Sequence, residues 1–336
     1  MSKLQEVADL ARVSKATVSR VINNHENVSA AARQSVWEAM RKLNLNANEM
    51  KRSHEGTMMI GLVLPLTSSI AANSFGMDIL LGVEEKAFEK DYMVLIGNSS
   101  GPNKEKAVVT QMMARDVEGI ILLSKNESSD HLHQLKQSGI PCVLVDQKVE
   151  GEQLHLVRGD NLSGAMNLTN YLFSLGHSNI AMVTPSRFST YKDRIRGFRI
   201  ALLERGIEAG PERLIDLDRD GVTMEQAMRK LLVQENRPTA VFIAQAADLL
   251  TAVRVISEYR LQIPEDINLV TFDDVYSPLP AEYVDYFTSI IQPAKIMGGM
   301  AVELLFQQVK EPAGMQAQEI VLPGTLNIRK STCPLA

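Results

Sequence analysis

Residues 13–23 read Val13-Ser14-Lys15-Ala16-Thr17-Val18-Ser19-Arg20-Val21-Ile22-Asn23, and the rest of the chain can be interpreted outward from them. Val18, Val21 and Ile22 are spaced i, i+3 and i+4, so a helix over this stretch has one apolar face. Ser14 precedes the helix where its hydroxyl can accept a hydrogen bond from a first-turn N–H. The residues off the apolar face are short, basic or amide-bearing, namely Lys15, Ala16, Thr17, Ser19, Arg20 and Asn23.

This polar face has the chemistry needed to contact a groove of DNA. Arginine can bridge O6 and N7 of guanine, asparagine can bridge N6 and N7 of adenine, and a small alanine can contact a thymine methyl. Ser2-Lys3-Leu4-Gln5 reads as a capping box that opens a preceding helix, and Ser29 caps a following one. Three short helices joined by short turns predict a helix-turn-helix unit. A purely structural three-helix domain is the alternative.

The distribution of charge supports a small polyanion-binding module at the N-terminus. The chain has 336 residues and a formal net charge of −5. Residues 1–55 hold nine basic and six acidic side chains, whereas the remainder holds 26 basic and 34 acidic ones. A basic head on an acidic body keeps the body away from nucleic acid. Chance scatter of charge is the competing interpretation.

The cysteines and the hydropathy pattern indicate a cytoplasmic protein. Cys142 and Cys333 are far apart in sequence and suggest neither a disulfide framework nor a metal site. The sequence has no hydrophobic signal core, and no apolar run approaches the roughly 18 residues that a membrane span needs. We therefore expect no membrane partner, no metal and no cofactor.

From Met58 onward, short apolar runs alternate with amphipathic segments. Strands are predicted at 59–64, 92–96, 119–123, 141–145, 180–183, 240–243 and 269–272. Helices are predicted at 75–90, 104–115, 162–174, 191–205, 224–234, 248–260 and 295–309. This β-α alternation predicts an α/β core of two doubly wound parallel sheets. Such sheets bind ligands beyond the carboxyl ends of their strands, and two of them form a cleft.

Signatures of catalysis are missing from the sequence. It contains no Gly-x-Ser-x-Gly, Gly-x-x-x-x-Gly-Lys, His-Glu-x-x-His or Gly-x-Gly-x-x-Gly motif. The pair His131-x-His133 lies in a polar segment and fits a solvated face better than a metal site. We therefore expect no catalytic residues and no enzymatic activity. A carbohydrate-binding protein or a sugar-processing enzyme on the same core is the alternative.

The residues resemble the LacI/GalR family of bacterial transcriptional regulators over nearly the whole chain. In the head, Leu4-Gln5-Glu6-Val7-Ala8, Val13-Ser14-x-x-Thr17-Val18-Ser19-Arg20-Val21-Ile22-Asn23, Val28-Ser29 and Arg33 match the family pattern. In the body, the similar motifs are Ile60–Pro65, Val117–Leu122, Asp160-Asn161-x-x-Gly164-Ala165, Leu175-Gly176-His177, Arg194-x-x-Gly197-Phe198, Pro264–Ile267, Phe272-Asp273-Asp274 and Leu326-x-x-Arg329-x-Ser331-Thr332.

The resemblance implies an N-terminal helix-turn-helix headpiece, a hinge and a two-lobed core similar to periplasmic binding proteins. Residues 1–46 are assigned to the headpiece and 47–57 to the hinge. Residues 58–157 plus 290–320 are assigned to the N-terminal lobe, and 158–289 plus 321–336 to the C-terminal lobe. The chain would then cross between lobes near residues 158, 289 and 321.

The resemblance also implies a DNA-binding repressor that acts as a homodimer. Its double-stranded operator would be near-palindromic, since two copies of one head read symmetric half-sites. A sugar-like effector bound between the lobes would control operator affinity. The effector site and the DNA site would then both shift one equilibrium between two conformations. By family position, Lys15, Ala16 and Arg20 read bases, and Ser14, Thr17, Ser19, Asn23 and Ser29 hold the DNA backbone.

The hinge departs from the family pattern, in which a leucine wedges into the minor groove and kinks the operator. Here His54 takes the wedge position, while Arg52 is retained. We predict that this protein kinks DNA less, or does so through Met50. A solvent-exposed hinge residue at His54 is the alternative.

The effector site also departs from the family. Arg194 matches the family's effector-clamping arginine, but the usual Asn-Asp pair is replaced by Gln245-Ala246. Lys192 and Arg196 lie close to Arg194, and the loss of a carboxylate near cations favours a sugar acid or sugar phosphate. The alternative is that these side chains face solvent. The predicted lining residues are Ser69, Asn73, Phe75, Asn98, Asp146, Arg187, Arg194, Gln245 and Asp273.

Overall fold

The computed structural model of the protein forms two compact units, one of residues 1–59 with 116–118 and one of residues 60–115 with 119–336. The structure describes residues 3–14, 17–18, 21, 28–43, 45, 56–66, 75–100, 103–123, 130–149, 151, 153–274, 285–310 and 316–335. The first unit holds the head, and the second holds both lobes of the core.

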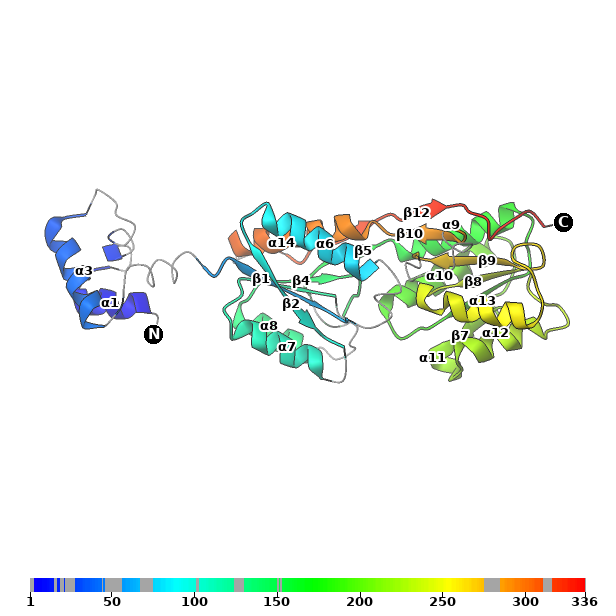
Figure 1. Ribbon diagram of the computed structural model, residues 1–336, viewed down its shortest axis with the longest axis horizontal. Helices are drawn as coiled ribbons and strands as arrows, with labels where there is room; N and C mark the ends of the chain where they lie inside the picture. Colours follow the sequence, from blue (N-terminus) through cyan, green and yellow to red (C-terminus); the bar gives the residue numbers. More distant parts are fainter. Residues whose placement is uncertain are drawn as a thin grey trace. The chain divides into compact units, whose positions relative to one another are not determined.

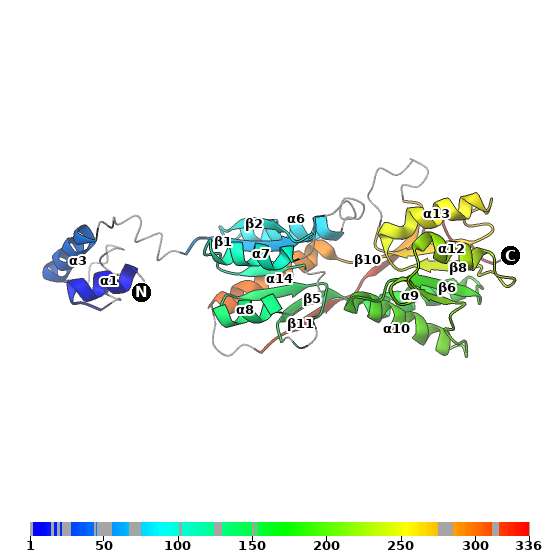
Figure 2. The same ribbon diagram turned by 90° about the horizontal axis from the view of Figure 1, so that it is seen from below.

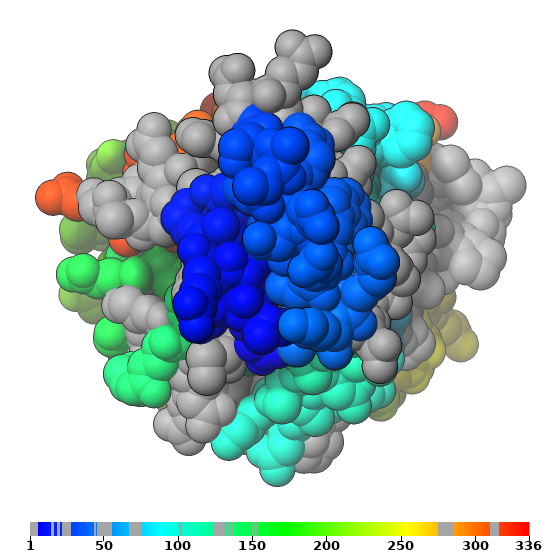
Figure 3. All heavy atoms as spheres, turned by 90° about the vertical axis from the view of Figure 1, so that its left-hand side faces the viewer, coloured from blue at the N-terminus to red at the C-terminus, as the bar shows by residue number. Residues whose placement is uncertain are grey.

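The head is built around the apolar face predicted for residues 13–23. Helices α1 (Lys3–Ala11) and α3 (Ala30–Lys42) lie side by side, dark blue and lighter blue in Figure 3. Val18 and Val21 are fully buried against apolar residues of both helices. Thr17 N donates to Ser14 Oγ at 3.1 Å, and Ala32 N donates to Ser29 Oγ at 3.2 Å. The predicted caps at Ser14 and Ser29 are therefore confirmed, whereas Ser2 of the predicted capping box lies outside the described residues.

The N-terminal lobe is a six-stranded sheet covered on both faces by helices. Its strand order is β11-β5-β4-β3-β1-β2, with β1 at Met59–Leu64, β2 at Met93–Asn98, β3 at Ile120–Leu122, β4 at Cys142–Val145, β5 at His155–Gly159 and β11 at Glu319–Leu322. Helices α6 (Phe75–Phe88) and α14 (Ala294–Lys310) pack on one face, and α7 (Lys104–Met113) and α8 (Asp130–Ser138) on the other (Figure 1).

The C-terminal lobe repeats this plan. Its strand order is β12-β10-β9-β8-β6-β7, with β6 at Ile180–Thr184, β7 at Leu214–Asp216, β8 at Ala240–Ile243, β9 at Asn268–Phe272, β10 at Thr288–Ile291 and β12 at Thr325–Asn327. Only β12 is antiparallel to its neighbour among the registered pairs of the described strands. Two helices pack on each face, α9 (Asn161–Ser174) and α10 (Ser189–Leu203) opposite α12 (Met224–Leu232) and α13 (Leu249–Glu258). Helix α11 (Leu217–Asp220) and the 3₁₀ turn η1 (Ala246–Asp248) are short.

The predicted fold class is confirmed, since both sheets are almost entirely parallel and doubly wound. All seven predicted core strands and all seven predicted core helices are present, with ends shifted by a few residues. The chain passes between lobes after β5, after β10 and after β11 (Figure 2). Gly159, Ile291 and Leu322 end these strands, so each crossing lies slightly later than the predicted 158, 289 and 321.

Close packing of α9 against α10 fixes the helix that carries much of the site. A Cβ added at Gly197 would lie 2.1 Å from the carbonyl oxygen of Leu162, far inside contact distance. Gly197 therefore lets the two helix backbones approach directly. Arg194 lies one turn before this contact, so its position is set by a rigid helix pair.

Candidate functional site

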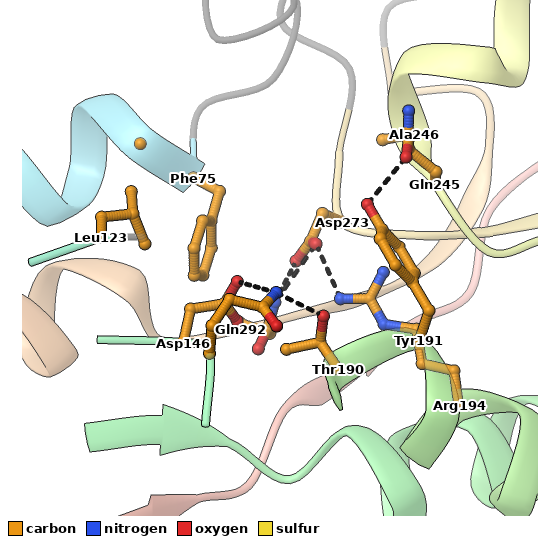
Figure 4. A pocket seen from close by; sticks show the side chains of 12 residues that line it. Phe75, Leu123, Asp146, Thr190, Tyr191, Arg194, Gln245, Ala246, Asp273 and Gln292 are labelled. Carbon is orange, nitrogen blue, oxygen red and sulfur yellow. Dashed lines mark hydrogen bonds and ion pairs between the residues drawn. The ribbon is translucent and has the colours of Figure 1, made fainter. Parts of the chain in front are cut away.

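A pocket lies between the lobes, beyond the carboxyl ends of strands from both sheets, as expected for doubly wound folds. It contains about 530 Å³ of space, part of which is open to solvent. Figure 4 shows the side chains that surround it. The lining residues are Phe75, Gly76, Leu123, Asp146, Gln147, Thr190, Tyr191, Arg194, Gln245, Ala246, Asp273 and Gln292.

Arg194, on α10, is fixed by contacts with several groups of the C-terminal lobe. Its Nε donates to Asn161 Oδ1 at 2.7 Å and its Nη1 to the carbonyl oxygen of Ala244 at 2.5 Å. The guanidinium lies over the ring of Phe272, 3.7 Å from its centroid. With only 4% of Arg194 exposed, the cation is pre-oriented before any ligand arrives.

Asp273 directly follows β9 and faces this cation. Arg194 Nη2 lies 3.4 Å from Asp273 Oδ2, and Gln292 Nε2 donates to both carboxylate oxygens at 3.0 and 3.2 Å. Burial raises the pKa of Asp273 above its ordinary value, and the nearby Arg194 opposes that shift. The carboxylate, the amide and the guanidinium therefore form one connected polar group at the base of the pocket.

Asp146, from the N-terminal lobe, contributes a second carboxylate to the lining of the pocket. Asp146 follows β4 with φ of +71°, a conformation that turns the chain sharply at the strand end. The neighbouring Gln147 Nε2 donates to Thr190 Oγ1 at 2.7 Å, and Ser189 Oγ donates to Gln147 Oε1 at 3.1 Å. These bonds join the loop after β4 to the start of α10, and so they join the two lobes at the rim of the pocket.

Aromatic rings provide the apolar part of the lining. Phe75, at the start of α6, lies on the N-terminal-lobe side, and Tyr191 lies on the C-terminal-lobe side (Figure 4). The Tyr191 hydroxyl donates to Gln245 Oε1 at 2.7 Å. Burial raises the pKa of Tyr191 well above its usual value, so it stays a neutral donor. Aromatic faces beside carboxylate, amide and guanidinium groups suit a small molecule with several hydroxyl groups.

The structure brings five of the nine predicted lining residues together, namely Phe75, Asp146, Arg194, Gln245 and Asp273. Two lie elsewhere. Asn98 accepts from the amides of Leu66 and Ser100 and holds a local turn. Arg187 lies 3.4 Å from Asp218 and is largely exposed. The remaining two, Ser69 and Asn73, are outside the described residues.

The geometry does not support the predicted preference for an anionic effector. Lys192 and Arg196 lie on α10 with their side chains exposed, and neither lines the pocket. Arg187 also faces Asp218 rather than the pocket. The Arg194 guanidinium in the lining is accompanied by the carboxylates Asp146 and Asp273. Lys192 and Arg196 are each two positions from Arg194, which puts them on another side of the helix.

Sequence reasoning missed Gln147, Thr190, Tyr191 and Gln292. Thr190 and Tyr191 precede Arg194 by four and three positions, so helical spacing alone would have placed them on its face. Gln147 adjoins the predicted Asp146. Gln292 gave no such signal, because it follows β10, a strand that the sequence pattern did not reveal.

Most of the predicted DNA-contacting residues lie outside the described part of the chain, namely Lys15, Ala16, Ser19, Arg20 and Asn23 of the head and Met50, Arg52 and His54 of the hinge. Ser14, Thr17 and Ser29 are described. Ser14 and Thr17 place their side-chain oxygens 2.9 Å apart, and both Ser14 and Ser29 act as helix caps.

The described residues offer neither a metal site nor a membrane-spanning helix. Within the described ranges, no group of three or more His, Cys, Asp or Glu side chains could hold a metal ion. No helix in the part of the chain that the structure describes is both long and apolar enough to cross a membrane.

These features define a class of protein. The head packs α1 and the Ser29-capped α3 around one apolar cluster that includes Val18 and Val21, and the core has a polar pocket between two doubly wound lobes. A head of this kind joined to a ligand-binding core is typical of a regulator that binds DNA and responds to a small molecule.

Comparison with known proteins identifies the family. Residues 3–48 match "Bacterial regulatory proteins, lacI family", and residues 169–332 match "Periplasmic binding protein-like domain". The repressor PurR of Aliivibrio salmonicida (strain LFI1238) is 30% identical over 316 residues, covering 93% of each chain. The chain belongs to the LacI family, and it is a transcriptional repressor that binds operator DNA under the control of a small-molecule effector.

Two solved structures are similar over almost the full length. One is the transcriptional regulator CelR in complex with cellobiose, with TM-score 0.73, 29% identity and coverage of 98% of this chain and 100% of that one. The other is the lac repressor dimer bound to operator and the anti-inducer ONPF, with TM-score 0.69, 26% identity and coverage of 99% of both chains.

Proposed function

We propose that the effector of this repressor is an uncharged sugar, bound in the pocket between the lobes. The observation that carries this proposal is the buried Arg194–Asp273 pair at 3.4 Å, with Asp146 facing it from the other lobe. Carboxylates accept hydrogen bonds from hydroxyls, and a guanidinium donates to ring or hydroxyl oxygens. The similar CelR was solved with cellobiose, which is consistent with a carbohydrate ligand.

Electrostatics favour a neutral effector over an acidic one. Among the described residues of the lining, Arg194 is the one cation; Asp273 already compensates it, and Asp146 adds a second carboxylate. A bound phosphate or sugar acid would face two like charges in a desolvated site. Phe75 offers a ring face on which the C–H groups of a sugar can pack.

The proposed DNA contacts follow from the head. Lys15, Ala16 and Arg20 read base edges, whereas Ser14, Thr17, Ser19, Asn23 and Ser29 hold phosphates. The burial of Val18 and Val21 supports this assignment, because these two valines form the inner apolar face that the assignment requires. Ser14 Oγ accepts from the Thr17 amide and lies 2.9 Å from Thr17 Oγ1, so one hydroxyl of this pair donates to the other and the accepting hydroxyl keeps its hydrogen for a phosphate.

The hinge assignments of Met50, Arg52 and His54 stay proposals. We propose that this protein kinks the operator less than a leucine wedge does, or that it kinks the operator through Met50. A circular-permutation assay distinguishes the two residues. A sharp kink that His54→Ala abolishes and Met50→Ala leaves intact contradicts the assignment to Met50.

The active species in this proposal is a cytoplasmic homodimer on a near-palindromic operator. An apolar surface on the N-terminal lobe has the chemistry of a subunit interface, because Phe88 and Met93 are 75% and 74% exposed. Phe88 ends α6, and Met93 begins β2 at the edge of the sheet. The change Met93→Asp is expected to shift sedimentation toward the monomer, and an unchanged dimer contradicts this interface.

A thermal-shift screen tests the effector class. Neutral sugars, sugar acids and sugar phosphates are compared on the full chain, and saturating ligand is expected to stabilise it by about 2.7 kcal/mol at 100 times Kd. Asp273→Asn should abolish the shift, whereas Asp218→Asn, outside the pocket, should keep it. A shift given only by acids or phosphates rejects an uncharged effector.

Operator binding separates the repressor from the two alternatives. A regulator binds one palindromic DNA site with an affinity that falls steeply as salt rises, and the effector changes that affinity. A carbohydrate-binding protein without DNA function shows ligand binding but no site-specific retention of DNA. An enzyme consumes the sugar, which chromatography of the incubated ligand detects.

A further inference from the structure

Five charged side chains form a continuous chain of ion pairs at the junction of the lobes, outside the pocket. Arg158 Nε lies 2.5 Å from Glu319 Oε1, and Arg158 Nη1 lies 3.3 Å from Asp193 Oδ2. Lys148 Nζ approaches Glu319 Oε2 at 3.5 Å. Arg196 Nη1 approaches Asp193 Oδ1 at 3.3 Å. We call these five residues the interlobe cluster.

The members of the cluster come from both lobes. Arg158 lies on β5, next to Gly159, after which the chain enters the C-terminal lobe, and Glu319 begins β11 beside it. Figure 2 shows β5 and β11 together leading toward that lobe. Asp193 belongs to α10 of the C-terminal lobe. The contact between Arg158 and Asp193 therefore connects the lobes, whereas the contact between Arg196 and Asp193 stays within α10.

We propose that the interlobe cluster is an electrostatic latch that holds the lobes at the angle at which the pocket is lined from both sides. Asp193 immediately precedes Arg194 on the same rigid helix. A movement of α10 away from β5 stretches the Arg158–Asp193 pair and at the same time opens the pocket. The latch thus favours the conformation that presents Asp146 and Arg194 to one ligand.

The latch is of moderate and salt-dependent strength. The side chains of Arg158, Asp193 and Glu319 are 21%, 22% and 36% exposed, so water and salt screen them partially. The Arg158 guanidinium lowers the pKa of Glu319 below its usual value, as expected for a formed ion pair. Raising the ionic strength should therefore weaken the latch without any change in sequence.

Hydrogen exchange on the full, ligand-free chain provides a direct readout. The amide of Lys148 donates to Ser189 Oγ at 3.0 Å, so its protection reports contact between the lobes. The change Asp193→Asn removes the charge that crosses the junction. We expect exchange of the peptide around Lys148 to accelerate about three- to tenfold, since opening no longer breaks this ion pair.

Two controls make the result specific to the latch. Arg196→Gln removes the other partner of Asp193 without affecting the link between lobes, so it should exchange like the wild type. High NaCl should accelerate exchange in the wild type toward the Asp193→Asn rate and leave that variant unchanged. The proposal is overturned if the peptide around Lys148 exchanges at the wild-type rate in Asp193→Asn. It is also overturned if Arg196→Gln accelerates this exchange equally, or if exchange accelerates uniformly across both lobes. Since no effector is used, none of these outcomes bears on the proposed sugar.

Discussion

The replacement Arg194→Met tests whether the buried Arg194 guanidinium stabilises the fold by balancing the charge of Asp273. Methionine fills much of the space beside Phe272 but makes no ion pair. The change removes the hydrogen bonds to Asn161 Oδ1 and to the carbonyl oxygen of Ala244, together with the 3.4 Å contact to Asp273. It leaves a carboxylate in the pocket base without its cation.

The expected loss of stability is large. Removing one partner of a buried ion pair costs about 3–5 kcal/mol, because the other charge stays buried without compensation. Adding Asp273→Asn removes that charge and leaves only neutral hydrogen-bond losses, which cost about 1–3 kcal/mol. We therefore expect the double variant to be more stable than Arg194→Met alone by about 2 kcal/mol.

The same reasoning fixes the pH dependence. Burial raises the pKa of Asp273 above its unfolded value, and loss of the opposing Arg194 raises it further. A group with a raised folded pKa stabilises the fold below its unfolded pKa, and this contribution is lost as pH rises through the folded pKa. Arg194→Met should thus lose less stability at acidic pH than at neutral pH, and the double variant should not show this difference.

Urea unfolding followed by circular dichroism measures these changes in the core. Trp37 is the single tryptophan and belongs to the head, so its fluorescence serves as an internal reference that should not change. If the two single losses simply add in the double variant, or if the effect of Arg194→Met is independent of pH, the charge-balance argument is refuted.

Three further expectations follow from other parts of the core. Gly197→Ala places a Cβ 2.1 Å from the carbonyl oxygen of Leu162, so thermal unfolding should show a loss of about 1–3 kcal/mol and ligand-induced shifts should shrink; a neutral result contradicts the close helix contact. Burial raises the pKa of Asp248 to about 6, so stability should fall by about 2 kcal/mol as pH rises from about 4 to about 6. Asp248→Asn should flatten that pH profile, and an unchanged profile assigns it to another group. Cys142 is 3% exposed and burial raises its pKa strongly, so native-state alkylation followed by mass spectrometry should leave it unmodified until the protein unfolds.

Much of the fold is predictable because its physical cause is local. Strands such as β1 and β8 are buried on both faces and read as continuous apolar runs, typical of parallel sheets. Asp146 and Asp273 follow such strands, and the carboxyl ends of parallel strands meet at the ligand-binding edge. Sequence order alone therefore placed these two carboxylates correctly, although they lie in different lobes.

The missed elements depend on distant partners. The strand β5 contains a histidine and an arginine, and β11 has an exposed glutamate, so neither reads as an apolar run. Both are strands through pairing, since β5 pairs with β4 and β11 pairs with β5 across a long sequence separation. Arg158 and Glu319 of the interlobe cluster lie on these two strands, and Gln292 follows β10, a third strand that the sequence pattern did not reveal. These three residues were thus hidden for the same reason as the strands beside them.

The arrangement of α10 explains how a ligand can influence the angle between the lobes. A ligand shifts a conformational equilibrium only through different affinities for the two states, so contacts with one rigid lobe have no effect. Here Asp146 comes from one lobe and Arg194 from the other, and a single bound molecule that contacts both stabilises their present spacing. Asp193, the neighbour of Arg194, makes the ion pair that favours the same spacing. The ligand and the interlobe cluster therefore act on one helix in the same direction. A weakened cluster should accordingly raise the concentration of ligand needed for the response while leaving the pocket contacts themselves intact.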